Sequence, residues 1–255
     1  MSYKKCFSRR IGGNKYLVHL WDDNGYQKVE WINQAYIECD EADATSVGLN
    51  GEPLRKTTKW TPDNPKLHFH DMTPYQKFLV EKYGINDEPS VTHKELYFDI
   101  EIEMGEALTE EYIKSAPKKV TSIAWYDRQV DQWGILILDA KGKMLHTKSK
   151  NKEIIPVRTE DELLMKFIER FREIDPDIIV GWNSDYFDIP YLYYRICNVL
   201  GEDIARYLSP IGYVRETPWY KDQFIQIAGV ESLDYMRLHK KFSWADEPSF
   251  KLDAI

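Results

Sequence analysis

The chain has 255 residues, of which 43% are hydrophobic, and it carries a formal net charge of −8. This composition excludes a disordered chain and allows one large domain or two ordinary ones. The acidic balance is unusual for a protein that binds nucleic acid through its whole surface, although it leaves room for local basic grooves.

The cysteines and the hydropathy pattern indicate the compartment. Cys6, Cys39 and Cys197 lie far apart in the sequence, so they form neither a disulfide framework nor a metal-ligand spacing. We recognise no signal peptide and no long apolar run. We therefore expect a soluble protein of the cytoplasm (the host cytoplasm for a viral protein) that does not contact membranes.

The first 40 residues predict a small antiparallel sheet. Alternating runs at 15–21 and 29–32 flank Asp22-Asp23-Asn24-Gly25, whose Asn and Gly tolerate the positive φ of a hairpin turn. Aromatic residues in these runs belong either to the core, which we favour, or to a surface on which bases of RNA or single-stranded DNA stack. They are Tyr16, Trp21, Tyr26 and Trp31.

A loop, a helix and a linker follow. Residues 41–66 are polar and rich in Pro, Gly and Thr, which predicts a long loop. Thr73 and Pro74 predict a helix start, and Gly84 its end. Glu88-Pro89-Ser90 is typical of a linker. We place a boundary near residue 92, which gives a small, mostly β N-terminal domain (1–92) and a second domain (93–255).

The second domain begins with an acidic strand at 97–103. Apolar and acidic residues alternate there with period 2, which predicts a half-buried strand. Three like charges on one face repel one another, and a divalent cation would remove that repulsion. The alternative is an amphipathic strand whose acidic face meets water. The acidic residues are Asp99, Glu101 and Glu103.

Two further strands, at 120–126 and 133–138, complete a predicted meander with the acidic strand. The segment 141–152 then holds five lysines and no acidic residue. It is either a solvated loop, which we favour, or a loop that contacts phosphates.

A helix from Thr159, stopped by Pro176, precedes a short apolar strand at 178–180. Residues 183–188 follow that strand directly, and a helix over 189–200 comes next. This α/β pattern places residues 183–188 where ligands bind in open sheets. Taken alone, Asp188 is most simply a helix N-cap.

These segments together resemble family B DNA polymerases, and most closely the replicative polymerases of large tailed bacteriophages. Phe98-Asp99-Ile100-Glu101 is similar to the first exonuclease motif of that family. The segment 179–191, Ile-Val-Gly-Trp-Asn-Ser-Asp-Tyr-Phe-Asp-Ile-Pro-Tyr, is similar to the second. Weaker similarity covers 206–210, 232–235, 240–243 and 248–253.

The resemblance implies a mixed α+β fold: a ribonuclease-H-like 3′→5′ exonuclease domain behind a small β domain. It also implies hydrolysis of phosphodiesters with two divalent metals, Mg²⁺ or Mn²⁺. Asp99 would bridge the metals, Glu101 would bind one of them and orient water, and Asp188 would hold the other. Asn183 and Phe187 would position a single-stranded 3′ end of DNA. Glu103 matches no role and is expected to be a surface acid.

The family's third exonuclease motif, Tyr-x-x-x-Asp, does not follow Asp188 in these 255 residues, and no palm, fingers or thumb segment is recognisable. We therefore expect an exonuclease domain that is incomplete at its C-terminus and weak or inactive alone. The chain is then a piece of a longer polymerase or one half of a polymerase made of two chains. Its partners would be primer-template DNA and, in the second case, another polymerase chain. The alternative function is a module that binds single-stranded DNA or RNA.

Overall fold

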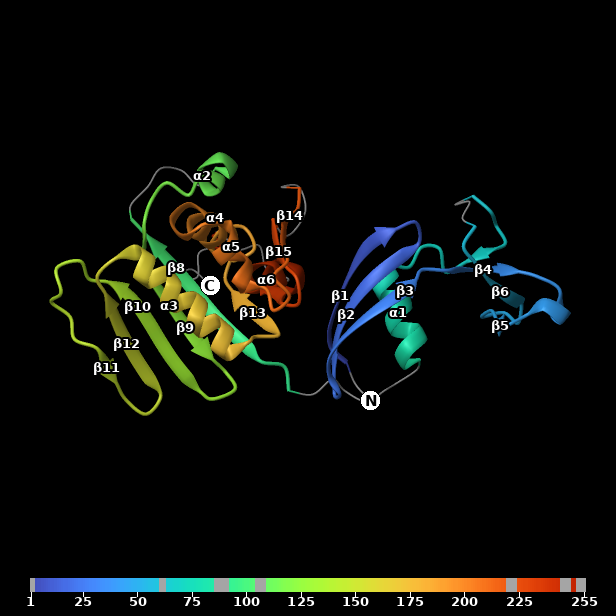
Figure 1. Cartoon of the computed structure of the whole chain (residues 1–255), viewed down its shortest axis with the longest axis horizontal. Coiled ribbons are helices and arrows are strands. Elements are labelled where there is room, and N and C mark those ends of the chain that lie inside the picture. The colour runs from blue at the N-terminus through green and yellow to red at the C-terminus, as the bar shows by residue number, and fades with distance from the viewer. Residues whose placement is uncertain are drawn as a thin grey trace. The chain divides into compact units, whose positions relative to one another are not determined.

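The computed structural model describes residues 3–59, 63–84, 92–103, 109–218, 224–243 and 249–250. The chain divides into two compact units, Met1–Val91 and Thr92–Ile255, and Figure 1 gives the order of their elements. The predicted linker at 88–90 and most of the segment 248–253 lie outside the described residues.

Unit 1 contains the predicted hairpin and helix. Strands β1 (Tyr3–Gly12), β2 (Lys15–Asp22) and β3 (Gly25–Ile32) form an antiparallel sheet. Helix α1 (Pro74–Tyr83) begins at Thr73, whose side chain and that of Gln76 form a capping box, and it ends at Gly84. Both the hairpin and the helix therefore match the sequence prediction.

The four aromatic residues of this sheet divide between two environments. Tyr16 and Trp31 pack against the buried cluster of Val18, Leu20 and Phe78, so for them the core interpretation is correct. Trp21 and Tyr26 instead contact each other, with ring centroids 5.0 Å apart.

The predicted long loop at 41–66 is wrong in part. A second sheet of unit 1 has the strand order β5-β6-β4-β7, and two of its strands, with a 3-10 turn (Glu41–Asp43), lie inside that segment. Each strand is short, and the central strand β4 depends on β6 and β7, which come much later in the sequence and which composition does not reveal. The strands are β4 (Ala35–Glu38), β5 (Ser46–Val47), β6 (Pro53–Thr57) and β7 (Leu67–His68).

Unit 2 is built on a seven-stranded mixed sheet with the order β11-β12-β10-β9-β8-β13-β16. The meander β8-β9-β10 is antiparallel, and β13 and β16 add to β8 in parallel. With β8 counted as the first strand and β11 and β12 left aside, the strands β10-β9-β8-β13-β16 follow the order 3-2-1-4-5. The strands are β8 (Glu95–Ile102), β9 (Val120–Asp127), β10 (Gln132–Leu138), β11 (Thr147–Lys148), β12 (Lys152–Val157), β13 (Ile178–Gly181) and β16 (Glu231–Asp234).

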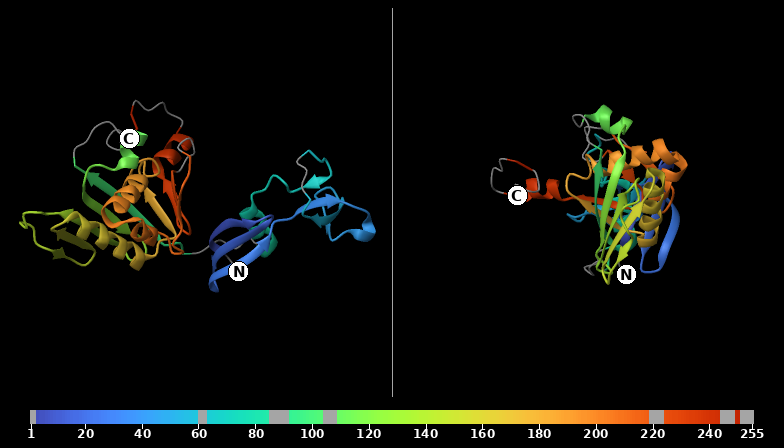
Figure 2. Two further views of the ribbon diagram at one scale, coloured as in Figure 1. Left: turned by 45° about the horizontal axis from the view of Figure 1, so that its top comes forward. Right: turned by 90° about the vertical axis from the view of Figure 1, so that its left-hand side faces the viewer.

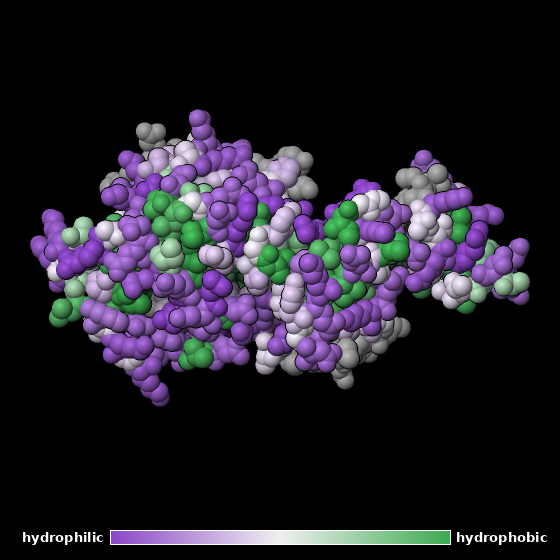
Figure 3. Space-filling view, in the orientation of Figure 1, coloured by the Kyte–Doolittle hydropathy of each residue, from purple (hydrophilic) through white to green (hydrophobic). Residues whose placement is uncertain are grey.

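Two long helices cover one face of this sheet. Helix α3 (Glu160–Ile174) begins at Thr159, whose side chain accepts a hydrogen bond from the backbone N–H of Glu162. It packs with α4 (Asp188–Leu200) against the core side of the strands, and Figure 2 shows both helices on one side of the sheet. In Figure 3, which has the orientation of Figure 1, hydrophilic residues cover most of the visible surface.

The smaller elements of unit 2 are α2 (Glu110–Ser115), α5 (Glu202–Ala205), a 3-10 turn (Arg206–Leu208), the hairpin strands β14 (Val214–Glu216) and β15 (Ile225–Ile227), and α6 (Tyr235–Phe242). The sequence did not predict α2 or β12. The predicted loop at 141–152 is wrong in part, because β11 and the first residue of β12 lie inside it and the two strands form a hairpin.

Alternation along β8 decides which side chains form the site. Phe98 and Ile100 are buried against the helices, so Tyr97, Asp99 and Glu101 point to the opposite face of the sheet. We call this the open face, because α3 and α4 lie on the other side.

Candidate active site

Strand β8 presents two carboxylates on the open face. Asp99 and Glu101 are both solvent-exposed residues two positions apart. Partial desolvation, and then the charge of Glu101, raise the pKa of Asp99 above its ordinary value. The two carboxylates therefore repel each other, as the sequence predicted.

Asp188 joins this pair from α4, but it is not the helix cap that its position allowed. Phe187 occupies the N-cap position, and Asp188 is the first helical residue. Its side chain is 2% exposed, and Oδ1 accepts a hydrogen bond of 3.1 Å from the backbone N–H of Ile100. The carboxylate is thus held directly against β8, between the positions of Asp99 and Glu101.

The surroundings of Asp188 disfavour its negative charge. Burial and the nearby charge of Asp99 raise the pKa of Asp188 to about 7, and the hydrogen bond from Ile100 offsets only part of this. A buried carboxylate that faces a second carboxylate needs either a proton or a cation to be stable.

The turn between β13 and α4 places the two predicted substrate-binding residues close together. Asn183 has a left-handed φ of 60°, and its carbonyl oxygen accepts a hydrogen bond from the backbone N–H of Phe187 at 3.1 Å. Phe187 packs on Tyr191 with ring centroids 5.5 Å apart. At Gly181 a Cβ atom would lie 2.6 Å from the Ser184 Cβ and 3.2 Å from the Phe98 carbonyl oxygen, so glycine allows the turn to approach β8.

A second acidic group supports this turn from β16. Asp234 is 3% exposed, and its carboxylate accepts hydrogen bonds from the backbone N–H groups of Asn183 (3.0 Å), Asp185 (3.2 Å) and Met236 (2.9 Å). Asp234 therefore links the start of α6 to the loop that carries Asn183.

Asp185, in the same turn, is 1% exposed and belongs to the same support. Its carboxylate accepts a hydrogen bond from the Ser232 hydroxyl and pairs with Arg237 at 3.0 Å. The sequence did not predict that Asp234 and Arg237 support the turn. Asp234 is the last residue of β16 and the N-cap of α6, and its contact with the turn depends on the pairing of β16 with β13.

The remaining acid of the strand lies outside the cluster. The backbone N–H of Glu103 donates to Lys119 and its side chain is exposed, as expected for a surface acid. In unit 1, His68 contacts Glu38 and His70 contacts the Leu67 carbonyl oxygen.

The donor set suits a hard divalent cation, because it consists of carboxylate oxygens and one of them is buried beside another negative charge. The side chains as they stand do not form a finished cage: in the part of the chain that the structure describes, no three acidic, His or Cys side chains converge closely enough to hold a metal ion. Likewise, no described helix is both long and apolar enough to span a membrane.

Comparison with known proteins gives a consistent result. The model of the exonuclease domain of DNA polymerase family B matches residues 96–255. The chain is 28% identical to the DNA-directed DNA polymerase of Escherichia phage RB69 over 286 residues, which covers 95% of this chain and 31% of that protein. It is 35% identical to the DNA-directed DNA polymerase of Enterobacteria phage T4 over 105 residues, 40% of this chain and 12% of that protein.

An archaeal relative, the DNA polymerase of Pyrococcus glycovorans, is 30% identical over 126 residues, which is 49% of this chain and 14% of that protein. The chain thus spans about a third of the length of the RB69 polymerase and less of the others.

Proposed function

Because the family model covers residues 96–255, the chain belongs to the family B DNA polymerases and contains their exonuclease domain, and we propose that it performs 3′→5′ proofreading in DNA replication. Residues 1–92 would then be a separate N-terminal domain and 93–255 the exonuclease domain. Its substrate would be the single-stranded 3′ end of a primer, and it would act in the cytoplasm. A polymerase made of two chains would also bring a second polymerase chain as its partner.

The observation that carries the proposal is the buried carboxylate of Asp188, fixed to Ile100 beside Asp99. Asp99, Glu101 and Asp188 would hold two Mg²⁺ or Mn²⁺ ions. When bound, these ions supply a hydroxide near neutral pH and stabilise the leaving 3′-oxygen.

The protein groups have separate tasks in this scheme. The Ile100 N–H holds Asp188 in place, so that the carboxylate does not have to be ordered when substrate arrives. Glu101, which is solvent-exposed, would orient the attacking water. Asn183 would donate a hydrogen bond to the terminal nucleotide, and Phe187 would pack against its sugar or base.

The test is digestion of a 5′-labelled single-stranded oligonucleotide with Mn²⁺, in which shortening from the 3′ end gives a ladder. We expect Asp99→Asn and Asp188→Asn to reduce the rate by at least about 100-fold, since each removes a charged ligand. Glu103→Gln is the matched control, because it neutralises an acid close to β8 that has no role in the site.

Cleavage that all three variants retain would overturn the proposal. If the wild-type chain alone cleaves too slowly to measure, as the sequence analysis expects, calorimetric titration with Mn²⁺ replaces the rate. Binding that Asp99→Asn abolishes and Glu103→Gln preserves would support the proposed ligands, and binding indifferent to both would refute them.

A further inference from the structure

The pairing of β8 with β9 is interrupted beside one of the proposed metal ligands. Glu101 on β8 pairs with Ser122 on β9, whereas the next residue, Ile102, pairs with Val120. Thr121 is therefore an extra residue on β9, and the interruption is a β-bulge. A bulge bends its strand and changes the direction of the side chains around it.

The burial pattern along β9 shows the same interruption. Val120 and Ile123 are both fully buried in the core of unit 2, although strict alternation would place residues three positions apart on opposite faces. The two residues between them, Thr121 and Ser122, therefore both lie opposite Glu101. The extra residue keeps Val120 in the core and leaves Glu101 at the irregular point of the sheet.

Glu101 depends on its backbone for its position. Its carboxylate forms no hydrogen bond or ion pair with any residue that the structure describes, whereas the carboxylate of Asp188 is fixed by the N–H of Ile100. The carbonyl oxygen of Glu101, however, accepts a hydrogen bond of 3.1 Å from the Thr121 hydroxyl. The extra residue of β9 thus holds the backbone that carries the carboxylate.

The residues just before the bulge are fixed by buried charged groups of the two long helices. The backbone N–H of Val120 donates a hydrogen bond of 2.8 Å to the carboxylate of Glu160 at the start of α3. Arg195 on α4 donates to the same carboxylate and also, at 3.0 Å, to the carbonyl oxygen of Ala116. The chain that enters the bulge is therefore tied to both helices.

Helix α4 makes these contacts with the face that begins at Asp188. Asp188, Tyr191 and Arg195 are three and then four positions apart, so they lie on one side of the helix. The Tyr191 hydroxyl donates to the Lys118 carbonyl oxygen at 2.8 Å and accepts from the Lys118 N–H at 3.0 Å. The helix that holds Asp188 against β8 therefore also fixes the segment that leads to the bulge beside Glu101.

We propose that the bulge at Thr121 positions Glu101 for metal binding, and that Thr121 is a positioning residue of the exonuclease site. The Thr121 hydroxyl fixes the backbone of Glu101, and Tyr191 and Arg195 tie the bulge to the helix that carries Asp188. The positions of Glu101 and Asp188 are in this way both set by α4. The inference rests on the proposed function, because it assumes that Glu101 is a metal ligand.

The test is calorimetric titration of the full chain with Mn²⁺. Thr121→Val keeps the branched shape of the side chain and removes the hydroxyl, and we expect it to weaken Mn²⁺ binding by about 10-fold, the lower end of the range for residues that orient metal ligands. Thr121→Ser keeps the hydroxyl and should bind within about 2-fold of the wild type. Thr121 is only partly buried, so both variants should fold.

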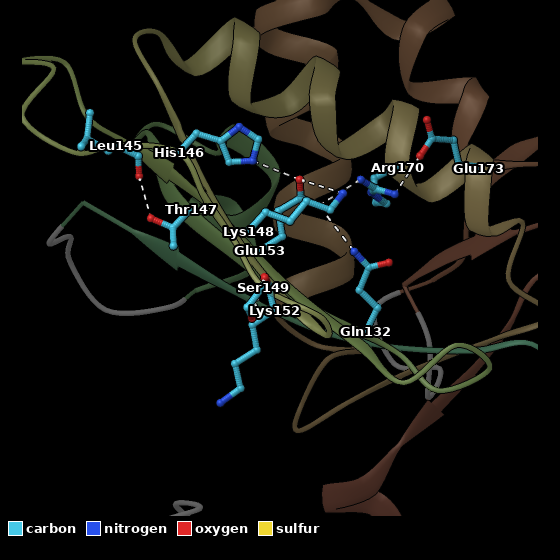
Figure 4. A network of polar contacts seen from close by, with 10 residues as sticks. All are labelled: Gln132, Leu145, His146, Thr147, Lys148, Ser149, Lys152, Glu153, Arg170 and Glu173. Carbon is cyan, nitrogen blue, oxygen red and sulfur yellow. Dashed lines mark hydrogen bonds and ion pairs between the residues drawn. The ribbon is translucent and has the colours of Figure 1, made fainter.

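Thr147→Val is the matched control. Thr147 lies on β11, and its hydroxyl also donates to a backbone carbonyl oxygen, that of Leu145 at 3.3 Å, as Figure 4 shows. This variant loses the same kind of hydrogen bond at a place that has no role in the site. It should bind Mn²⁺ as the wild type does.

Amide hydrogen exchange in EDTA tests the bulge without metal. The N–H of Glu103 donates to the Lys119 carbonyl oxygen just beyond the bulge. We expect Thr121→Val to speed the exchange of this amide by about 5-fold, which corresponds to the loss of one hydrogen bond. Thr147→Val should leave it unchanged.

Unchanged Mn²⁺ binding in Thr121→Val would overturn the proposal, as would unchanged exchange of the Glu103 amide. Equal weakening of Mn²⁺ binding in Thr121→Ser or Thr147→Val would also contradict it. The proposed function fails in a different way: Mn²⁺ binding that is absent from the wild type, or indifferent to Asp99→Asn, refutes the ligands and the positioning together. A loss of binding in Asp99→Asn without a loss in Thr121→Val refutes only the positioning.

Discussion

Asp188 makes the metal-free site a pH-dependent source of instability. Its pKa is raised from 3.8 to about 7 in the folded chain, by burial and then by Asp99. The folded chain therefore holds an extra proton between these two values, and stability falls as pH rises through that window. The full effect corresponds to about 4 kcal/mol above pH 7. Between pH 5 and pH 8 it amounts to roughly 2.5 kcal/mol.

We predict that Asp188→Asn stabilises the chain in EDTA, and that its advantage over the wild type grows by about 2.5 kcal/mol from pH 5 to pH 8. The amide keeps an Oδ1 acceptor for the N–H of Ile100, so the substitution removes charge without removing the hydrogen bond. Urea unfolding at each pH, followed by circular dichroism, gives the free energies.

Glu103→Gln serves as the control, since it neutralises an exposed acid close to the same strand, and its difference from the wild type should stay constant with pH. Other carboxylates with raised pKa values, such as Asp185, are present in all three proteins and cancel in the comparison. A gap between Asp188→Asn and the wild type that is constant within about 0.5 kcal/mol from pH 5 to pH 8 would refute the electrostatic argument.

Three further predictions concern the scaffold and use the same unfolding measurement. Arg195→Ala should destabilise the chain by about 3–5 kcal/mol, because it leaves the buried carboxylate of Glu160 without a cation. In the wild type, Arg195 donates two hydrogen bonds of 2.7 Å to that carboxylate. A loss of stability below about 1 kcal/mol would contradict this. Gly134→Ala should cost about 1–3 kcal/mol, because the new Cβ would overlap the ring of Trp125, and an unchanged midpoint would show that the ring moves freely. Thr159→Ala should cost about 1 kcal/mol by removing the cap of α3, and no loss would mean that packing alone fixes that end.

The sequence predicted those elements whose signals are local. Helix α1 lies between its Thr73 cap and Gly84, and β8 follows the alternation of apolar and acidic residues. Strands β11 and β12 were not predicted, because a run of lysines gives no periodic signal and their pairing depends on β10. The same reason explains the missed four-stranded sheet of unit 1.

Part of the candidate site could be predicted from the sequence, and part could not. Residue type and spacing together with the family resemblance singled out Asp99, Glu101 and Asp188, but only the fold shows that Asp188 is buried against Ile100. The support from Asp234 could not be predicted, since Asp234 lies 51 residues after Asn183, whose backbone N–H it binds. Contacts between strands so distant in sequence are set by sheet order, which no local pattern contains.

The geometry also explains why the charged form of Asp188 destabilises the folded chain. Fixing Asp188 through a backbone N–H requires burial beside β8, and burial beside β8 places it next to Asp99. The repulsion is thus a consequence of the positioning for as long as both carboxylates are charged. A cation that binds only the folded chain at 100 times its Kd would return about 2.7 kcal/mol, a large part of what the buried charge costs. A cation bound at this site would therefore couple its own binding to the stability of unit 2 through Asp188.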